Sequence, residues 1–281
     1  MKGSWNNNRG ATDILTNGQL IETHCHLNDS EAFPDVSQAL KRAHDAGIAA
    51  CIVIGIDEDS SRKAVELSEA YSGLYCTVGW HPNHAQTWSD QSIIVLQELM
   101  QSQKVLAIGE IGLDYHWEYA TREQQFRALN EQLDLAQKHQ MRTVFHCREA
   151  YSDLLDLLEK RDWKEPLLHC FSGSLSDAQR AQELGAYFGI DGPITYKNAE
   201  VLREIVRTLP HDRLVLETDA PYLSPHPFRG KPNEPALLPL VNAGLAATLG
   251  LDAQACAQMT TANAQRFFGP RLKLDLPESN S

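Results

Sequence analysis

Short apolar segments alternate with amphipathic segments along most of the chain. The apolar segments have the length and composition of buried strands, and those between them have the three-to-four-residue spacing of helices. Eight strands are predicted, at residues 20–26, 48–56, 74–80, 105–111, 141–147, 166–171, 186–191 and 213–218. Helices are predicted between them at 35–46, 60–71, 90–103, 122–140, 149–160, 175–184 and 198–208, and afterwards at 236–249 and 252–268.

The order of these elements predicts the fold class. Strands that are apolar on both faces and separated by helices indicate a parallel sheet. Eight strand–helix units favour a single-domain α/β protein, a closed (β/α)8 TIM barrel. An open doubly wound sheet is the alternative, but it would normally carry a glycine-rich phosphate turn near the first strand, and none is present there. Gly47, Gly73 and Gly185 stand just before strands, where a left-handed residue readily ends a helix.

Length and composition agree with one barrel. The chain has 281 residues, 42% hydrophobic and 22% charged, and such barrels have about 250 residues. The barrel is predicted over residues 20–269, between a polar extension at 1–19, expected to be disordered, and a polar tail at 270–281. The first 20 residues lack a secretory signal's apolar core, and no apolar run approaches the roughly 20 residues that span a bilayer. We therefore expect a cytoplasmic enzyme without membrane contact.

The positions of the cysteines and the net charge indicate the state of the thiols and the strength of nucleic-acid binding. Five of the six cysteines lie in strand-like apolar runs and none forms a CxxC pair, so buried reduced thiols are predicted. Cys25, Cys147 and Cys170 adjoin histidines, and strand alternation predicts that they point away from them, toward the helices, if the backbone stays extended. The net charge of −12 argues against tight binding of duplex DNA. A nucleic-acid substrate would be bound weakly and transiently.

Imidazole and carboxylate side chains stand at the ends of five predicted strands. The candidate metal ligands are His24, His26, Glu110, His146, His169 and Asp219. Any one of these histidines alone would more often be an ordinary core or surface residue, but the ends of parallel barrel strands meet at one mouth. Zn, Mn, Fe and Mg accept such ligands, and a carboxylate can bridge two ions. The pattern predicts two divalent metal ions, of Mg, Mn or Zn.

Other polar residues have candidate roles around this centre. Glu22 shares the inward strand face of His24 and His26, either as an acceptor for an imidazole N–H or as a buried polar neighbour. Asp219 can also orient or deprotonate an attacking water, so Asp219 and Glu110 are the expected catalytic groups. Candidates for binding a substrate phosphate are His81, Arg148, Arg229 and Lys231. The alternative for Arg148 is a salt bridge with a neighbouring acid.

Seven motifs resemble, in this order, those of the TatD-type metal-dependent deoxyribonucleases, which are amidohydrolase-like (β/α)8 enzymes. They are HCHL, GWHP, GEIGLDY, HCR, HCFSG, ETDAPYL and RGKPNEPA, between about Ile21 and Gly269. The resemblance implies that the six candidate ligands hold two divalent ions, that Glu110 bridges them and that His81 contacts the substrate phosphate. It also implies hydrolysis of DNA phosphodiesters, often 3′→5′ on single strands and usually with Mg or Mn.

Two residues depart from the family pattern. Glu22 stands where the family more often has Asp, which puts metal affinity rather than mechanism in question. Trp80 replaces an aliphatic residue beside His81, where it offers a base a stacking surface or packs outward.

Two other functions compete with DNA hydrolysis. The same metals could attack a carbonyl, as in an amidohydrolase or an aminoacyl-tRNA deacylase. Many binuclear amidohydrolases bridge their ions with a carboxylated lysine, whereas this chain has Glu110 there and Lys104 at the other end of the strand. The phosphodiester reading is therefore favoured. A barrel retained only as a binding subunit is disfavoured by the intact ligand set, and the sequence identifies no protein partner.

Overall fold

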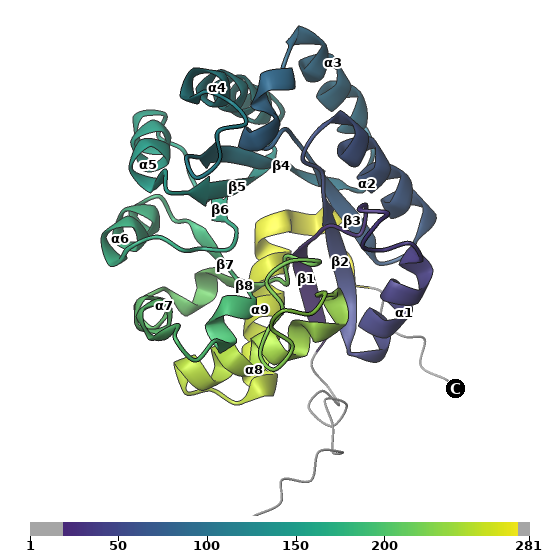
Figure 1. The fold of residues 1–281 in the computed structure, drawn as a ribbon, viewed down its shortest axis with the longest axis vertical. Helices are drawn as coiled ribbons and strands as arrows, with labels where there is room; N and C mark the ends of the chain where they lie inside the picture. Colours follow the sequence, from purple (N-terminus) through teal and green to yellow (C-terminus); the bar gives the residue numbers. More distant parts are fainter. Residues whose placement is uncertain (1–18, 275–281) are drawn as a thin grey trace, which may run out of the picture.

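Eight parallel strands form one sheet whose order follows the chain from β1 to β8, with helices around it (Figure 1). The computed structural model describes residues 19–274. The strands are β1 (Leu20–Cys25), β2 (Ile48–Ile54), β3 (Leu74–Val78), β4 (Val105–Asp114), β5 (Arg142–Arg148), β6 (Leu167–Leu168), β7 (Tyr187–Ile190) and β8 (Leu214–Leu216). The helices are α1 (Val36–Asp45), α2 (Glu58–Ala70), α3 (Asp90–Leu99), α4 (Arg122–His139), α5 (Tyr151–Lys160), α6 (Leu175–Glu183), α7 (Glu200–Val206), α8 (Leu238–Leu249) and α9 (Ala253–Phe268).

The sheet closes where β1 meets the segment that follows β8. Cys25 and Ala220 form an isolated parallel bridge. The backbone N–H of Asp219 donates to the carbonyl of His24 at 2.9 Å, and the Thr23 hydroxyl donates to the carbonyl of Leu216 at 2.9 Å. The prediction of a (β/α)8 barrel is confirmed, and the open doubly wound alternative is wrong.

Each predicted strand and helix is present, but some strands have different lengths. β6 and β8 are shorter than predicted because the backbone turns into the left-handed region soon after them, at Cys170 (φ 43°) and Asp219 (φ 55°). Gly47, Gly73 and Gly185 have φ of 87°, 72° and 71°, as predicted for residues that end helices.

Two apolar cores lie on either side of the strands. One fills the barrel interior and includes Ile52, Val144 and Val215. Phe267, near the end of α9, belongs to this core, and the Arg142 guanidinium at the start of β5 lies 5.6 Å from its ring centre. α9 therefore closes the end where the strands begin. The other core lies between the strands and the helices, which leaves the carboxyl ends of the strands open for a site.

The flanking segments are described only in part. Residues 1–18 of the expected extension and 275–281 of the expected tail lie outside the described residues. Gln19 accepts a hydrogen bond from the Thr261 hydroxyl at 2.7 Å, and Leu272 is buried in the barrel-interior core. Within residues 19–274, no single helix has the length and apolar composition of a membrane span; only the bent pair Pro235–Leu249 and Ala253–Arg271, at 104°, passes that test together.

The cysteines are all free, as predicted. Cys25 and Cys147 pack in the core between strands and helices, as the alternation argument predicts, although Cys147 also lines the cavity described below. The argument fails for Cys170, because the backbone there is not extended; this residue is half-buried and lines the same cavity.

Candidate metal centre

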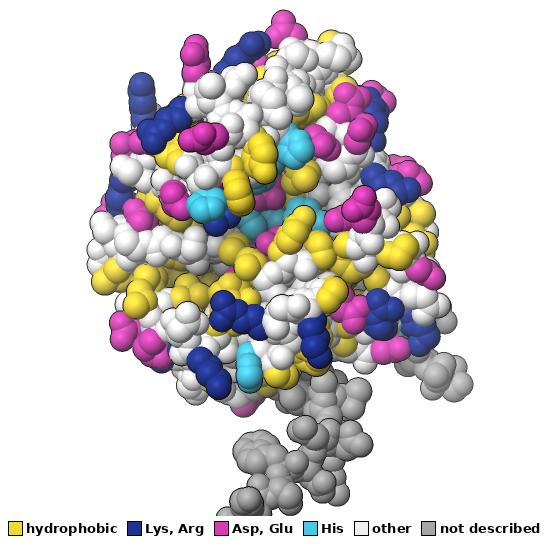
Figure 2. Space-filling view, viewed as in Figure 1, with side chains coloured by type: hydrophobic (Ala, Val, Ile, Leu, Met, Phe, Trp, Pro, Cys, Tyr) yellow, Lys and Arg dark blue, Asp and Glu magenta, His cyan; other side chains and the backbone are white. Residues whose placement is uncertain are grey.

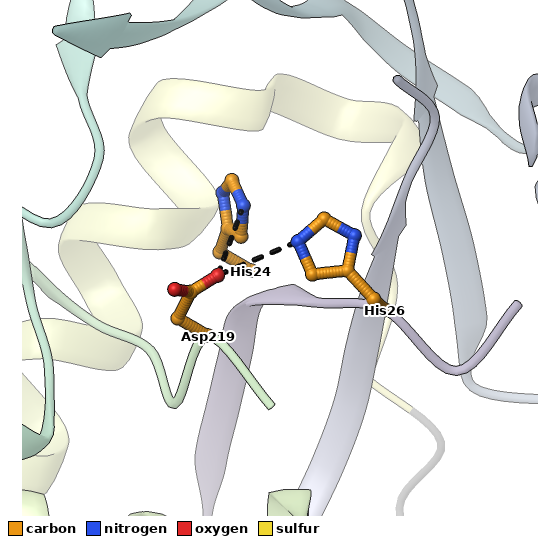
Figure 3. Close-up of side chains that lie close together, drawn as sticks. All are labelled: His24, His26 and Asp219. Carbon is orange, nitrogen blue, oxygen red and sulfur yellow. Dashed lines mark ion pairs between the residues drawn. The ribbon is translucent and has the colours of Figure 1, made fainter. Parts of the chain in front are cut away.

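The carboxyl ends of the strands bring all the predicted ligands together. β1 carries His24 and is followed by His26, β4 carries Glu110 and β5 carries His146, while His169 follows β6 and Asp219 follows β8. Figure 3 shows the imidazoles of His24 and His26 directed at the Asp219 carboxylate. Their Nε2 atoms lie 3.7 and 3.4 Å from its Oδ1.

Glu110 lies between the histidines of different strands. Its Oε2 is 3.5 Å from Nε2 of His24, and its Oε1 is 2.8 Å from Nε2 of His169 and 3.0 Å from Nδ1 of His146. Burial alone would raise the pKa of this carboxyl, but the surrounding histidines, His169 foremost, outweigh it and hold the pKa well below its usual range. Glu110 is therefore an ionised carboxylate with one oxygen toward each group of histidines.

The chemistry of this donor set fits divalent metal ions. His24 is fully buried, yet neither of its ring nitrogens has a hydrogen-bond partner within the described part of the chain. Buried polar atoms normally have partners, so such an orphan points to a missing one. Ligands bound at roughly 2.1 Å to one ion lie about 3 to 3.5 Å apart, close to the separations found here. Three groups of residues have the spacing to hold an ion: His24–His26–Asp219, His24–Glu110–His169 and His81–Asp114–His146.

Glu22 does not contact an imidazole. Its Oε1 accepts the backbone N–H groups of His24 at 3.0 Å and Thr218 at 2.9 Å, and burial raises its pKa to about 8. Of the two predicted roles, that of a buried polar neighbour holds: Glu22 ties β1 to the segment after β8.

Two carboxylates beside the centre were missed by the sequence reasoning. Oδ2 of Asp114 lies 2.9 Å from Nε2 of His146, and Oε1 of Glu217 lies 3.5 Å from Nδ1 of His169. Both stand inside motifs already recognised, GEIGLDY and ETDAPYL. Asp114 comes four residues after Glu110, and Glu217 two before Asp219. A second acidic residue near a candidate ligand at the end of a strand was the sequence signal that could have identified both.

An open cavity of about 1060 Å³ lies above the centre. Figure 2 shows the hollow, with histidine and acidic side chains at its floor and hydrophobic side chains around it. His81 lines it, with Nε2 3.7 Å from Oε1 of Glu110. Nδ1 of His81 accepts the backbone N–H of Asn83 at 3.0 Å. The proton of the neutral ring is then on Nε2, facing the centre.

The two predicted arginines are placed differently. Arg148 lines the cavity and is exposed; it has no ion pair among residues 19–274, so the salt-bridge alternative is not observed. Its guanidinium lies 5.9 Å from the ring centre of Trp117. Arg229 is not among the lining residues, and its guanidinium lies 4.5 Å from the ring centre of Tyr196. Lys231, the other loop cation, lies 5.6 Å from the ring centre of Phe228.

Trp80 offers no stacking surface at the site. It is buried, its indole N–H donates to the Thr87 hydroxyl at 3.1 Å, and its ring packs edge-on against Trp88. The outward-packing alternative is the correct one.

Comparison with known proteins agrees with this geometry. The family model described as TatD related DNase matches residues 21–269, which is most of the chain. The chain belongs to the TatD-related DNase family. Membership makes it a metal-dependent hydrolase acting on ester bonds, and the candidate ligand groups support divalent metals as its cofactors.

Several TatD-family relatives align over nearly their full lengths. YabD of Bacillus subtilis, named an uncharacterized metal-dependent hydrolase, is 35% identical over 89% of this chain and 98% of its own. A protein of Erwinia billingiae named 3′-5′ ssDNA/RNA exonuclease TatD is 37% identical over 89% of this chain and 98% of its own. The crystal structure of YJJV, a TatD homolog from Escherichia coli, superposes with a TM-score of 0.83 at 34% identity, covering 92% of this chain and 98% of that one.

Proposed function

We propose that this TatD-family hydrolase cleaves phosphodiester bonds in single-stranded DNA, removing nucleotides from the 3′ end at a centre of two divalent ions. The observation that carries the proposal is the position of Glu110, whose two oxygens face different histidines at the floor of an open cavity. Relatives named as 3′-5′ ssDNA/RNA exonucleases support the substrate class and the polarity. A cytoplasmic location is part of the proposal and agrees with the free thiols.

The donor set would hold the two ions with Glu110 shared between them. The remaining ligands are His24, His26, His146, His169 and Asp219. Bound Mg, Mn or Zn supplies Lewis acidity, which stabilises negative charge on a phosphoryl oxygen and lowers the pKa of a water.

Asp219 is the proposed proton acceptor. Burial raises the pKa of this carboxyl, but the facing His26, together with His169 and His24, outweighs burial and keeps the pKa below its usual value. Asp219 is therefore ionised and lines the cavity. It would take a proton from the attacking water as the new P–O bond forms. The P–O3′ bond then breaks, and the 3′ oxygen of the shortened strand gains a proton.

His81 and Arg148 would hold the substrate phosphate. The Nε2–H of His81 points toward the centre, where it can donate to a phosphate oxygen. Arg148 supplies a cation at the cavity wall that no described acid neutralises. Arg229 stands outside the cavity lining, so we propose that it contacts the strand farther from the centre. With a net charge of −12, these local contacts give a weak and transient complex.

The polarity and the substrate are tested together with labelled oligonucleotides. A 5′-labelled single strand should shorten stepwise into a ladder, whereas a 3′-labelled strand should release labelled mononucleotide from the start. A matched duplex should be cut more slowly. Internal fragments from both labels would contradict 3′→5′ action. Intact DNA beside efficient deacylation of charged tRNA would replace the proposal with carbonyl chemistry at the same centre.

A further inference from the structure

Two exposed aromatic side chains stand at the wall of the cavity. Trp117 and Tyr119 lie in the loop between β4 and α4, and their side chains are 45% and 61% exposed. Their ring centres are 5.8 Å apart and their planes differ by 32°, so they form a shallow shelf. Both line the cavity above the metal centre. Two neighbouring aromatic rings left exposed at the wall of a cavity offer a surface that a ligand can cover.

The shelf is held in place relative to the metal centre. Oδ1 of Asp114 accepts the backbone N–H groups of His116 at 2.9 Å and Trp117 at 3.3 Å. Its other oxygen is the one that contacts His146. On the far side of the loop, the Gln125 side chain donates to the carbonyls of Asp114 and Ala120, at 2.8 and 3.2 Å. The loop backbone is therefore hydrogen-bonded at both ends, which holds Trp117 and Tyr119 beside the cavity.

A cation without a described ion-pair partner adjoins the shelf. Arg148 follows the candidate ligand His146 by two residues along β5, and its guanidinium lies 5.9 Å from the ring centre of Trp117. An aromatic face, a neighbouring cation and the candidate metal centre line one cavity, as the base, the adjoining phosphate and the scissile phosphate of one strand would require.

We propose that Trp117 and Tyr119 form a subsite that stacks an unpaired nucleobase of the substrate strand, with Arg148 on the adjoining phosphate. Every base has a π face, so the subsite accepts any sequence, but a base inside a duplex is already stacked and paired. The shelf thus selects single strands over duplexes. This inference rests on the proposed function for its class of substrate.

Kinetics on matched substrates test the subsite. Trp117→Ala should raise KM for a single-stranded oligonucleotide by roughly tenfold, the scale of one lost base–aromatic stack, with little change in kcat. Trp117→Phe should restore most of the loss. On an oligonucleotide whose 3′-terminal nucleotides are abasic, wild type and Trp117→Ala should have equal KM values, because no base is there to stack. Val201→Ala, an exposed apolar position on α7, is the control and should change nothing.

A binding measurement separates this inference from the proposed function. With EDTA present to prevent turnover, an oligonucleotide should quench the fluorescence of the full-length protein, and Trp117→Phe should abolish most of that quenching. If the oligonucleotide quenches fluorescence but is not hydrolysed with any metal, the base-stacking subsite is supported and the proposed nuclease activity is rejected. Hydrolysis with unaltered KM in Trp117→Ala and unaltered quenching in Trp117→Phe would overturn the subsite and assign the shelf to another occupant, such as a protein.

Discussion

Oδ2 of Asp114 lies 2.9 Å from Nε2 of His146, on the opposite side of the ring from Glu110. The contact directs the other ring nitrogen, Nδ1, at Glu110, 3.0 Å away. Burial raises the pKa of Asp114, but the contact with His146 outweighs burial and lowers the pKa to about 2. The acid therefore stays ionised. Asp114 thus orients a candidate metal ligand and anchors the Trp117 loop with the same carboxyl group.

Replacing the acid tests this orienting role. In Asp114→Asn the amide can still accept the loop N–H groups, but the negative charge facing His146 is lost. We expect metal affinity to fall about 10- to 100-fold, the usual effect of removing such a partner, with little change in unfolding free energy. Calorimetric titration measures the metal affinity, and urea unfolding in EDTA measures the unfolding free energy. Asp134→Asn, a surface acid paired with Arg161, is the control. Wild-type metal affinity in Asp114→Asn would refute the role.

Glu110 carries the two-ion proposal. Glu110→Gln removes the shared carboxylate charge while keeping the side-chain shape. We expect the bound metal to fall from two equivalents per chain to one or fewer, because an amide is a poor bridging ligand. Elemental analysis of the equilibrated protein gives the count. A variant that still binds two equivalents at wild-type affinity would show that Glu110 does not bridge.

His81 is expected to act on substrate and not on metal. His81→Ala should lower kcat/KM on single-stranded DNA by roughly 100-fold, the scale of one lost donor to developing charge, while metal content stays unchanged. His44→Ala, an exposed histidine on α1, is the matched control. Wild-type kinetics in His81→Ala would leave that residue with a structural role only.

An ion-pair network at the closed end of the barrel predicts a pH effect on stability. Glu165 accepts from Arg142 at 2.6 Å and Arg213 at 2.9 Å, which lowers its pKa. A lowered folded-state pKa stabilises the fold above the unfolded-state pKa, and this contribution is lost as the pH falls through the folded-state value. Because the side chain is about one-third exposed, we expect only about 0.5 kcal/mol. Urea unfolding in EDTA should show Glu165→Gln destabilised at pH 7 and the difference shrinking below pH 4; a constant difference would contradict this account.

The barrel could be predicted from the sequence, and so could the gathering of the candidate ligands at one end of it, because both follow from periodicity. Eight apolar strands alternating with helices leave few topologies, and parallel strand ends gather at one mouth. His24, Glu110 and Asp219 therefore had to lie near one another. Cys170 was different: alternation assumes an extended backbone, and a left-handed residue there changes the direction of its side chain.

Contacts that depend on side-chain rotation could not be predicted from the sequence. Asp114 meets His146 from 32 residues away, after a shift in register within β4 between Ile108 and Ile111. The position of Arg229 depends on the path of an irregular loop, for which no periodicity exists. The position of Trp117 depends on hydrogen bonds that anchor its loop, and the sequence motif does not show which groups form them.

We propose that the protein hydrolyses DNA at a metal centre, with Asp219 as the proton acceptor. The most direct measurement is digestion of 5′-labelled single-stranded DNA by the purified protein with Mg, Mn or Zn, beside an EDTA control and the Asp219→Asn variant. We predict metal-dependent shortening by the wild type, and a rate at least about 100-fold lower in the folded variant, the scale of general-base catalysis. Intact DNA under every metal, or equal rates for wild type and Asp219→Asn, would contradict the claim.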